Sequence, residues 1–259
     1  MARSEADKLQ SAYRFLLSDL MPFGRNARIQ LEHGGVNDSA EHYETVTFWY
    51  GLPAASLIKT DEIDIGNEES EQEHGYFSPE ASARTELTSR FEWGPDTLDG
   101  IEIYPAHTED GRTTVGTSEF TLQIDPENVG VMLRRTLDYG FPNQRAIVAV
   151  ADASEPNSAL KDSDFEPAGI WYLAGSNLPV FSDPPDELGA AEHVLRESNR
   201  RFRDDEFLLP RALTRGRSAI RVRVTFTPVK TPLFPGHPVA PLAWSELGYS
   251  AYSFVLPKL

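Results

Sequence analysis

The stretch 220–226 reads Ile220-Arg221-Val222-Arg223-Val224-Thr225-Phe226 and indicates the fold class of the chain. Apolar and polar side chains alternate there with a period of two, so a strand turns the apolar ones to one face. The arginines and the threonine then lie on the other face. This pattern predicts a β-strand with one face against a core.

Similar runs of β-branched and aromatic residues recur along the chain, and 19 prolines and 18 glycines scattered among them favour short strands over long helices. Helical spacing is convincing only over 187–201. We therefore predict an all-β protein. The runs that predict strands are 28–33, 45–50, 120–125, 129–137, 146–151, 169–173, 207–209, 220–227 and 249–256.

An acidic segment divides the pattern, because 61–73 holds seven carboxylates and few apolar residues. We expect a loop or linker over 61–85 and a separate domain over 86–259. Eight antiparallel strands in two facing sheets make a jelly-roll β-sandwich, and the second domain offers eight candidates. They lie around Phe91 and at 117–125, 129–137, 145–152, 168–174, 204–210, 218–228 and 247–256.

Residues 1–60 hold too few strands for a sandwich of their own, with two strong candidates at 26–34 and 43–51 and a weaker one at 13–23. Both strong candidates are rich in apolar and aromatic side chains, and their edges need cover from the second domain or from another chain. We expect them to complete another jelly roll with a partner chain. Such an interface is large and obligate, within a symmetric hetero-oligomer.

Composition excludes several classes of protein. With 40 acidic and 24 basic residues the formal charge is −16, which disfavours a nucleic-acid partner. No run approaches the ~18 apolar residues of a membrane span, and zero cysteine excludes disulfides and thiolate chemistry. The first eight residues contain no apolar run typical of a secretory signal, so the default location is the cytoplasm, although a partner that carries a signal could export the chain.

Two blocks of sequence resemble glycoside hydrolase family 172, formerly described as domain of unknown function 2961. The first block reads YRFLLSDLMPF at 13–23, LEHGGVND at 31–38 and YETVTFWY at 43–50. The second reads DPENVGVMLRR at 125–135, GIWY at 169–172, DDEFLLP at 204–210, WSEL at 244–247 and YS at 252–253.

The resemblance implies two jelly rolls in one chain, assembly into trimers or hexamers, and retaining hydrolysis or transfer on α-linked D-fructofuranosides or D-arabinofuranosides. The family also carries a Gly-Thr-Glu-Asp-Tyr-Phe element in its first jelly roll, which this sequence lacks. The chain is thus similar to the C-terminal part of such an enzyme. We expect a small subunit, inactive alone, whose larger partner carries the first jelly roll and the main catalytic carboxylates.

Within the first block, Glu32 is the candidate catalytic carboxylate, because it lies on a predicted strand beside His33 and a glycine pair that permits close approach of a ligand. A strand-end carboxylate bonded to backbone or arginine is the alternative. The candidate substrate-binding residues are His33, His42, Glu44, Trp49 and Tyr50. Glu44 also fits a solvated strand end, and both aromatics also fit a core or an interface.

We expect no metal and no cofactor, since the spacing of His33, His42, His74, Glu32 and Glu44 fits no ligand motif, and neither a nucleotide-binding loop nor a catalytic triad is present. Two hypotheses for function remain. In the first, the chain is a subunit of an exo-acting α-D-furanosidase for arabinan or fructan-type oligo- or polysaccharides. In the second, it is a non-catalytic structural or carbohydrate-binding jelly-roll chain needed for oligomer assembly.

Overall fold

The alternating stretch at 220–226 forms strand β13 (Ala219–Phe226), and its side chains divide between two faces as predicted. Val222 and Val224 are fully buried. Arg221 and Arg223 lie on the opposite face and pair with Glu119 of the neighbouring strand. Burial of one face and ion pairing on the other are what a half-solvated sheet requires.

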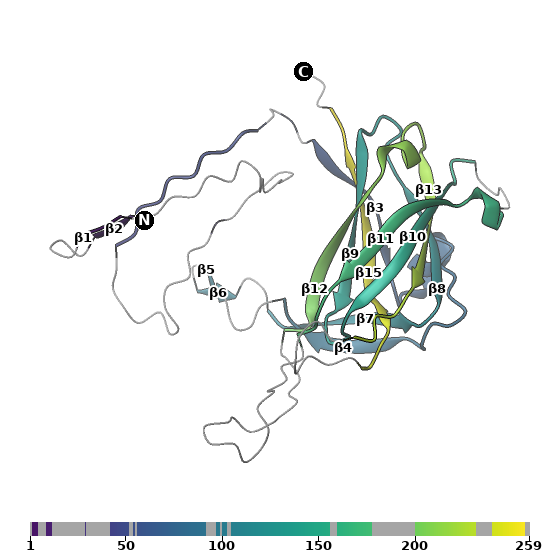
Figure 1. Cartoon of the computed structure of the whole chain (residues 1–259), viewed down its shortest axis with the longest axis horizontal. Coiled ribbons are helices and arrows are strands. Elements are labelled where there is room, and N and C mark those ends of the chain that lie inside the picture. The colour runs from purple at the N-terminus through teal and green to yellow at the C-terminus, as the bar shows by residue number, and fades with distance from the viewer. Residues whose placement is uncertain are drawn as a thin grey trace, which may run out of the picture.

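The computed structural model describes residues 2–4, 9–11, 29, 42–51, 54, 56–91, 97–98, 100–102, 105–155, 160–177, 200–231 and 240–256. Two four-stranded sheets form a β-sandwich (Figure 1). One sheet has the order β12-β9-β15-β3, with β12 (Phe202–Leu209), β9 (Gly130–Asp138), β15 (Gly248–Phe254) and β3 (Leu57–Asp64). The other has the order β11-β10-β13-β8, with β11 (Glu166–Leu173), β10 (Gln144–Asp152), β13 and β8 (Thr117–Gln123).

The connectivity of these eight strands is that of a jelly roll. Counted one to eight along the chain, they have the orders 6-3-8-1 and 5-4-7-2 in the two sheets. Every neighbouring pair is antiparallel. Successive strands therefore alternate mostly between the two sheets, as two nested Greek keys require.

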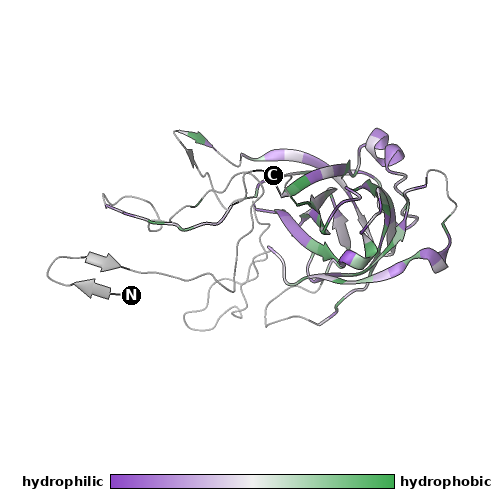
Figure 2. Ribbon diagram, turned by 90° about the horizontal axis from the view of Figure 1, so that it is seen from above, coloured by the Kyte–Doolittle hydropathy of each residue, from purple (hydrophilic) through white to green (hydrophobic). Residues whose placement is uncertain are grey.

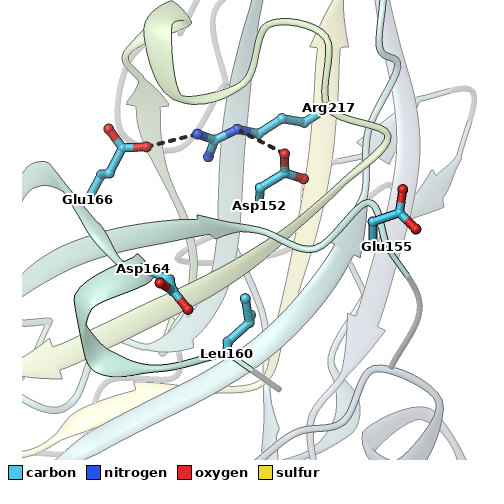
Figure 3. Close-up of a pocket in the computed structure, with 6 residues that line it drawn as sticks. All are labelled: Asp152, Glu155, Leu160, Asp164, Glu166 and Arg217. Carbon is cyan, nitrogen blue, oxygen red and sulfur yellow. Dashed lines mark hydrogen bonds and ion pairs between the residues drawn. The ribbon is translucent and has the colours of Figure 1, made fainter. Parts of the chain in front are cut away.

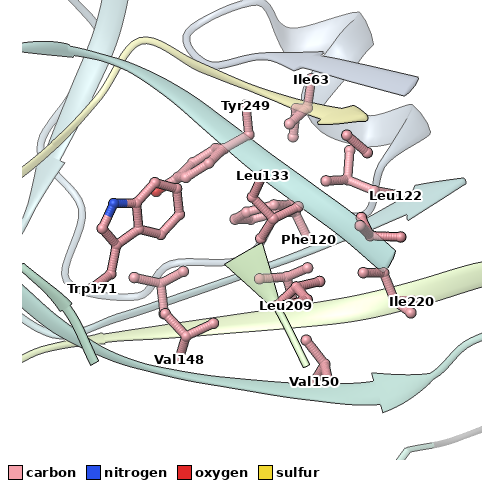
Figure 4. Close-up of a cluster of buried hydrophobic side chains, with 14 of the residues drawn as sticks. Ile63, Phe120, Leu122, Leu133, Val148, Val150, Trp171, Leu209, Ile220 and Tyr249 are labelled. Atoms are coloured by element: carbon pink, nitrogen blue, oxygen red, sulfur yellow. The ribbon is translucent and has the colours of Figure 1, made fainter. Parts of the chain in front are cut away.

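The hydrophobic core lies between the two sheets (Figure 4). Leu133 of β9 and Ile63 of β3 come from one sheet, and Val148 of β10 and Phe120 of β8 come from the other; all four are fully buried. Figure 2 shows apolar and polar residues alternating along the sandwich strands. The alternation seen in the sequence thus builds one core from both sheets.

Smaller elements surround the sandwich. A three-stranded sheet has the order β14-β7-β4, and two short antiparallel pairs are β1 with β2 and β5 with β6. Their bounds are β14 (Trp244–Glu246), β7 (His107–Thr114), β4 (Thr85–Ser89), β1 (Ala2–Ser4), β2 (Leu9–Ser11), β5 (Thr97–Leu98) and β6 (Ile101–Glu102). The helices are α1 (Glu68–Glu73), η1 (Asp162–Asp164) and η2 (Arg211–Leu213). No helix of the described residues is long and apolar enough to span a membrane.

The predicted loop over 61–85 is a correction to the sequence interpretation. Residues 61–64 belong to β3, which pairs with β15 and is the first strand of this sandwich. Residues 68–73 form α1, capped by the side chain of Asn67. The sandwich therefore begins at Leu57 rather than near residue 86. The acidic residues obscure this strand in the sequence: Glu62 and Asp64 are exposed and Asp61 is half-buried, whereas Ile63 between them is fully buried.

Two further strand predictions also differ from the structure. Residues 85–89 form β4 of the three-stranded sheet, so the strand expected around Phe91 is not part of the sandwich. Residues 45–50 form no strand, because no neighbouring strand pairs with them among the described residues. The candidates at 13–23 and 26–34, apart from Ile29, and the helix expected over 187–201, apart from its last two residues, lie outside the described residues.

Candidate functional site

Four of the five residues that the sequence nominates for substrate binding lie on an exposed segment, 42–51, away from the sandwich (Figure 1). His42 and Glu44 are brought together, with Nε2 and Oε1 3.2 Å apart, and both side chains are exposed. Trp49 and Tyr50 are exposed as well, so neither side chain belongs to the hydrophobic core of this chain. Glu32 and His33 lie outside the described residues.

The same segment carries an unusual amount of exposed apolar surface. Val46, Phe48 and Tyr50 occupy alternate positions and are 80%, 91% and 94% exposed. Large apolar side chains at a period of two, presented together to solvent, are typical of a surface that binds another protein or a ligand. The segment therefore has the side-chain pattern of a strand, and no strand of the described part of the chain pairs with it.

A second candidate site is a cavity of about 440 Å³ at one end of the sandwich (Figure 3). Its lining side chains are mostly acidic: Asp152, Glu155, Leu160, Asp164, Glu166 and Arg217. The residues come together because β10 ends at Asp152 and pairs with β11, which begins at Glu166. Arg217 precedes β13, whose first residues pair with the end of β10.

Arg217 organises this cavity. Its Nη2 donates a hydrogen bond to Oε1 of Glu166 at 2.8 Å, and its Nε lies 3.9 Å from Oδ2 of Asp152. The arginine side chain is only 15% exposed, whereas both carboxylates are more than half exposed. Its buried Nη1 has no hydrogen-bond partner among the described residues. A rigid cation thus holds two solvent-facing carboxylates in place.

The electrostatics of Asp152 follow from two further hydrogen bonds. Burial raises the pKa of this carboxyl, but the hydroxyl and backbone N–H of Ser154, followed by Arg217, outweigh burial and hold the pKa below its usual value. The Ser154 Oγ and N atoms lie 2.6 and 2.9 Å from Oδ1. Asp152 is therefore an ionised acceptor at neutral pH.

Carboxylates and a guanidinium are acceptors and donors that suit the hydroxyl groups of a sugar. No group of three or more histidine, aspartate or glutamate side chains among the described residues is arranged to hold a metal ion. The charged side chains that line the cavity can form hydrogen bonds with a polar ligand.

A third group of charges lies inside the molecule and is fully buried. Glu246 of β14 accepts hydrogen bonds from the hydroxyls of Tyr76, Ser118 and Tyr249, at 2.8, 2.8 and 2.7 Å. Burial raises the pKa of Glu246 despite these donors and the nearby Arg135. The carboxylate joins the three-stranded sheet to the core of the sandwich.

Arg135 of β9 is the buried cation of this network. It donates to Gln144 Oε1 at 3.1 Å, to the carbonyl of Ser245 at 3.2 Å, and to Asp205 Oδ2 at 3.3 Å. Burial lowers the pKa of its guanidinium, with opposing contributions from Tyr249, Asp205 and Glu246. Since the network is enclosed and has these internal partners, it serves structure rather than ligand binding.

The sequence interpretation did not nominate Asp152, Glu166 or Arg217. The sequence did contain a signal for this site, because all three residues lie at or next to the ends of runs that predict strands. Neighbouring antiparallel strands bring the end of one beside the start of the next. Finding the cavity required knowing which strands are neighbours.

Comparisons with known proteins assign no family. No protein-family model matched the chain, and no curated protein matched it. Among solved structures, the chain is similar to the K2 cleaved adhesin domain of Lys-gingipain, with 13% sequence identity and a TM-score of 0.26. The match covers 79% of this chain and 89% of that one. A similarity at this level carries no argument about activity.

Proposed function

We propose that this chain is a subunit of a retaining glycoside hydrolase that acts on α-linked D-furanosides. The substrate class is D-arabinofuranose in arabinan or D-fructofuranose. A larger partner subunit supplies the first jelly roll and the main catalytic carboxylates, and the two chains form a symmetric hetero-oligomer. The support is the resemblance of the two sequence blocks to glycoside hydrolase family 172, together with a jelly-roll sandwich in the matching part of the chain. The cytoplasmic location stays a prediction.

The observation that carries the proposal is the exposed segment 42–51. The sandwich at 57–256 already has its eight strands, so this segment is not needed to complete it. Yet Val46, Phe48 and Tyr50 alternate as they would in a strand with one buried face. Adding such a strand to the edge of a partner's sheet satisfies its backbone and buries its apolar side chains.

In the assembled enzyme, two carboxylates about 5–5.5 Å apart would flank the scissile bond. One attacks the anomeric carbon as nucleophile while the other protonates the departing oxygen, and water then releases the sugar. Glu32 is the carboxylate that this chain would bring to the pocket. His33, His42, Glu44, Trp49 and Tyr50 are the candidate residues for its wall. Trp49 and Tyr50 point to opposite faces of a strand, so only the ring of Trp49, on the face away from the buried row, would lie against the sugar.

The test is co-expression with the protein encoded by the adjacent open reading frame, followed by an assay on an α-linked D-arabinofuranoside. We expect activity from the complex and none from the chain alone. Glu32→Gln should reduce the rate at least about 100-fold, whereas Glu68→Gln on exposed α1 should leave it unchanged. Full activity in the Glu32→Gln complex would remove this chain from the chemistry.

The acidic cavity favours a second candidate function, a non-catalytic carbohydrate-binding or assembly chain. Its solvent-facing carboxylates and the anchored Arg217 provide hydrogen-bond partners for sugar hydroxyls without any contribution from segment 42–51. Calorimetric titration of the chain alone with arabinan oligosaccharides tests this function. Binding that disappears in Arg217→Gln would support it, and absence of binding by the wild-type chain would reject it.

A further inference from the structure

Segment 42–51 has two faces, and contacts within the segment show which residues share a face. His42 and Glu44 lie two residues apart and meet through Nε2 and Oε1. The indole of Trp49 lies against Gly51, which is also two residues away. Residues two apart share a face when the backbone is extended, and residues one apart point to opposite faces. Figure 1 shows the segment as an extended trace.

The indole of Trp49 occupies the space that a side chain at position 51 would need. A Cβ atom placed on Gly51 would lie 2.2 Å from Cζ3, 3.0 Å from Cε3 and 3.3 Å from Cη2 of Trp49. Carbon atoms in van der Waals contact are about 3.5–4.0 Å apart, so even a methyl group does not fit there. The six-membered ring of the indole therefore packs directly on the backbone at Gly51.

Glycine is needed at position 51 for this close approach and not for the backbone conformation. The φ angle of Gly51 lies outside the left-handed region that favours glycine. The backbone at position 51 therefore accommodates an alanine, and its methyl group would collide with the indole. Because the ring is the end of a flexible side chain, the ring would move and the backbone would stay in place.

The contact restrains a side chain that stays exposed. Trp49 is 67% exposed although its ring packs against Gly51. The ring lies on the side of the segment opposite to Val46, Phe48 and Tyr50, so burial of that apolar row against a partner would leave the ring accessible. An aromatic side chain that is already held in one orientation loses little conformational entropy when it binds a ligand.

We propose that Gly51 is a positioning residue for the indole of Trp49. Gly51 acts through its lack of a side chain, because the bare backbone lets the ring pack on it in the orientation that would meet a furanose unit of the substrate. This inference rests on the proposed function. It names the residue that orients the aromatic ring expected to lie against the sugar.

Fluorine NMR of the full chain labelled with 5-fluorotryptophan tests the contact. The sequence has four tryptophans, and Trp49→Phe identifies the resonance of Trp49. Gly51→Ala should shift that resonance and leave those of the buried Trp171 and Trp244 in place. A Trp49 resonance that does not respond to Gly51→Ala would overturn the inference.

The matched control is another glycine beside an aromatic ring. A Cβ atom on Gly130 would lie 3.7 Å from Phe254, which is an ordinary contact distance. Gly130→Ala should therefore leave the Trp49 resonance unchanged. A shift of equal size in this control would show that the resonance does not report the contact with Gly51, and would also overturn the inference.

Kinetics of the co-expressed complex test the role of the contact. On an α-linked D-arabinofuranoside, Gly51→Ala should raise KM about 2- to 10-fold, as expected for loss of one aromatic stacking contact, and leave kcat nearly unchanged. Gly130→Ala should change neither constant. An unchanged KM in Gly51→Ala, or a fall in kcat alone, would overturn the inference.

A double-mutant cycle separates positioning of the ring from a general effect on the segment. If Gly51 acts through the indole, Gly51→Ala should not raise KM further in a chain that already carries Trp49→Ala. Additive effects of the two substitutions would contradict the inference. A wild-type complex without activity on any furanoside would reject the proposed function instead, and the fluorine spectrum would still decide whether Gly51 positions the ring.

Discussion

The guanidinium of Arg135 stacks on the indole of Trp244, with its central carbon 3.3 Å from the ring centroid. Both side chains are fully buried between the sheets. A buried arginine is tolerated only where aromatic faces, hydrogen-bond acceptors and a carboxylate replace water, and here Trp244, Gln144 and Asp205 do so. The stacking ties β14 to β9 and makes the charged network part of the core.

Removal of the carboxylate partner should destabilise the sandwich strongly. In Asp205→Ala the buried guanidinium of Arg135 loses its ion pair and the indole N–H of Trp171 loses its acceptor, so we expect a loss of about 3 kcal/mol in the free energy of unfolding. The neighbouring Glu206→Ala removes only the exposed partner of Arg134 and should cost no more than about 1 kcal/mol. Urea unfolding of both variants measures the contrast, and equal losses would contradict it.

The buried Glu246 should make stability depend on pH. Burial raises its pKa in the folded chain above the ordinary value of 4.5. The folded state then binds more protons than the unfolded state between the two pKa values. The stability contribution is complete below pH 4.5 and is lost as the pH rises through the folded pKa.

Glu246→Gln removes that titration while it keeps an oxygen for the hydroxyls of Tyr76, Ser118 and Tyr249. Relative to this variant, the wild-type chain should therefore lose stability as the pH rises from 4.5 through the folded pKa of Glu246. The free energy of unfolding of both proteins across this range is the measurement. Parallel pH profiles would show that Glu246 titrates equally in the folded and unfolded states.

The pKa of Asp152 should respond to its hydrogen-bond donors in a definite order. Ser154 opposes the effect of burial more than Arg217 does. Ser154→Ala, which removes the hydroxyl, should therefore raise the pKa of Asp152 more than Arg217→Gln does, and both variants should raise it. Carboxyl NMR titration reports the values directly. An unchanged pKa in either variant would contradict the geometry of the cavity.

The exposed aromatic segment should be dispensable for folding. Phe48→Ser and Tyr50→Ser lie outside the sandwich and should each change the free energy of unfolding by less than about 0.5 kcal/mol. Leu133→Ala, within the core, should cost about 2–5 kcal/mol. The same serine variants should fail to bind the larger subunit. Large destabilisation by either one would place the segment in the fold of this chain.

Alternation along a strand allowed much of the sandwich to be predicted. Arg134 and Arg135 must face opposite ways on one strand, and the structure confirms it: Arg134 pairs with exposed Glu206, and Arg135 lies inside. Seven of the predicted sandwich strands lie where the apolar runs indicate. The exception was β3, because its acidic residues hide the alternation of Leu57, Ile63 and Ile65.

The candidate sites were harder to predict for a physical reason. Asp152, Glu166 and Arg217 are far apart in sequence and meet only because β10 lies between β11 and β13. Glu246 shows no local sign that its side chain is buried, since β14 is three residues long. The amino-acid composition shows how many carboxylates the chain has. It does not show which strand ends lie next to each other in the fold.

Hydrogen exchange over 42–51 tests the central claim most directly, namely that this segment is a strand for the sheet of another chain. We expect its amides to exchange rapidly in the chain alone and to become protected, together with loss of solvent exposure at Phe48 and Tyr50, in the co-expressed complex. Protection already present in the isolated chain, or rapid exchange that persists in an active complex, would contradict the account.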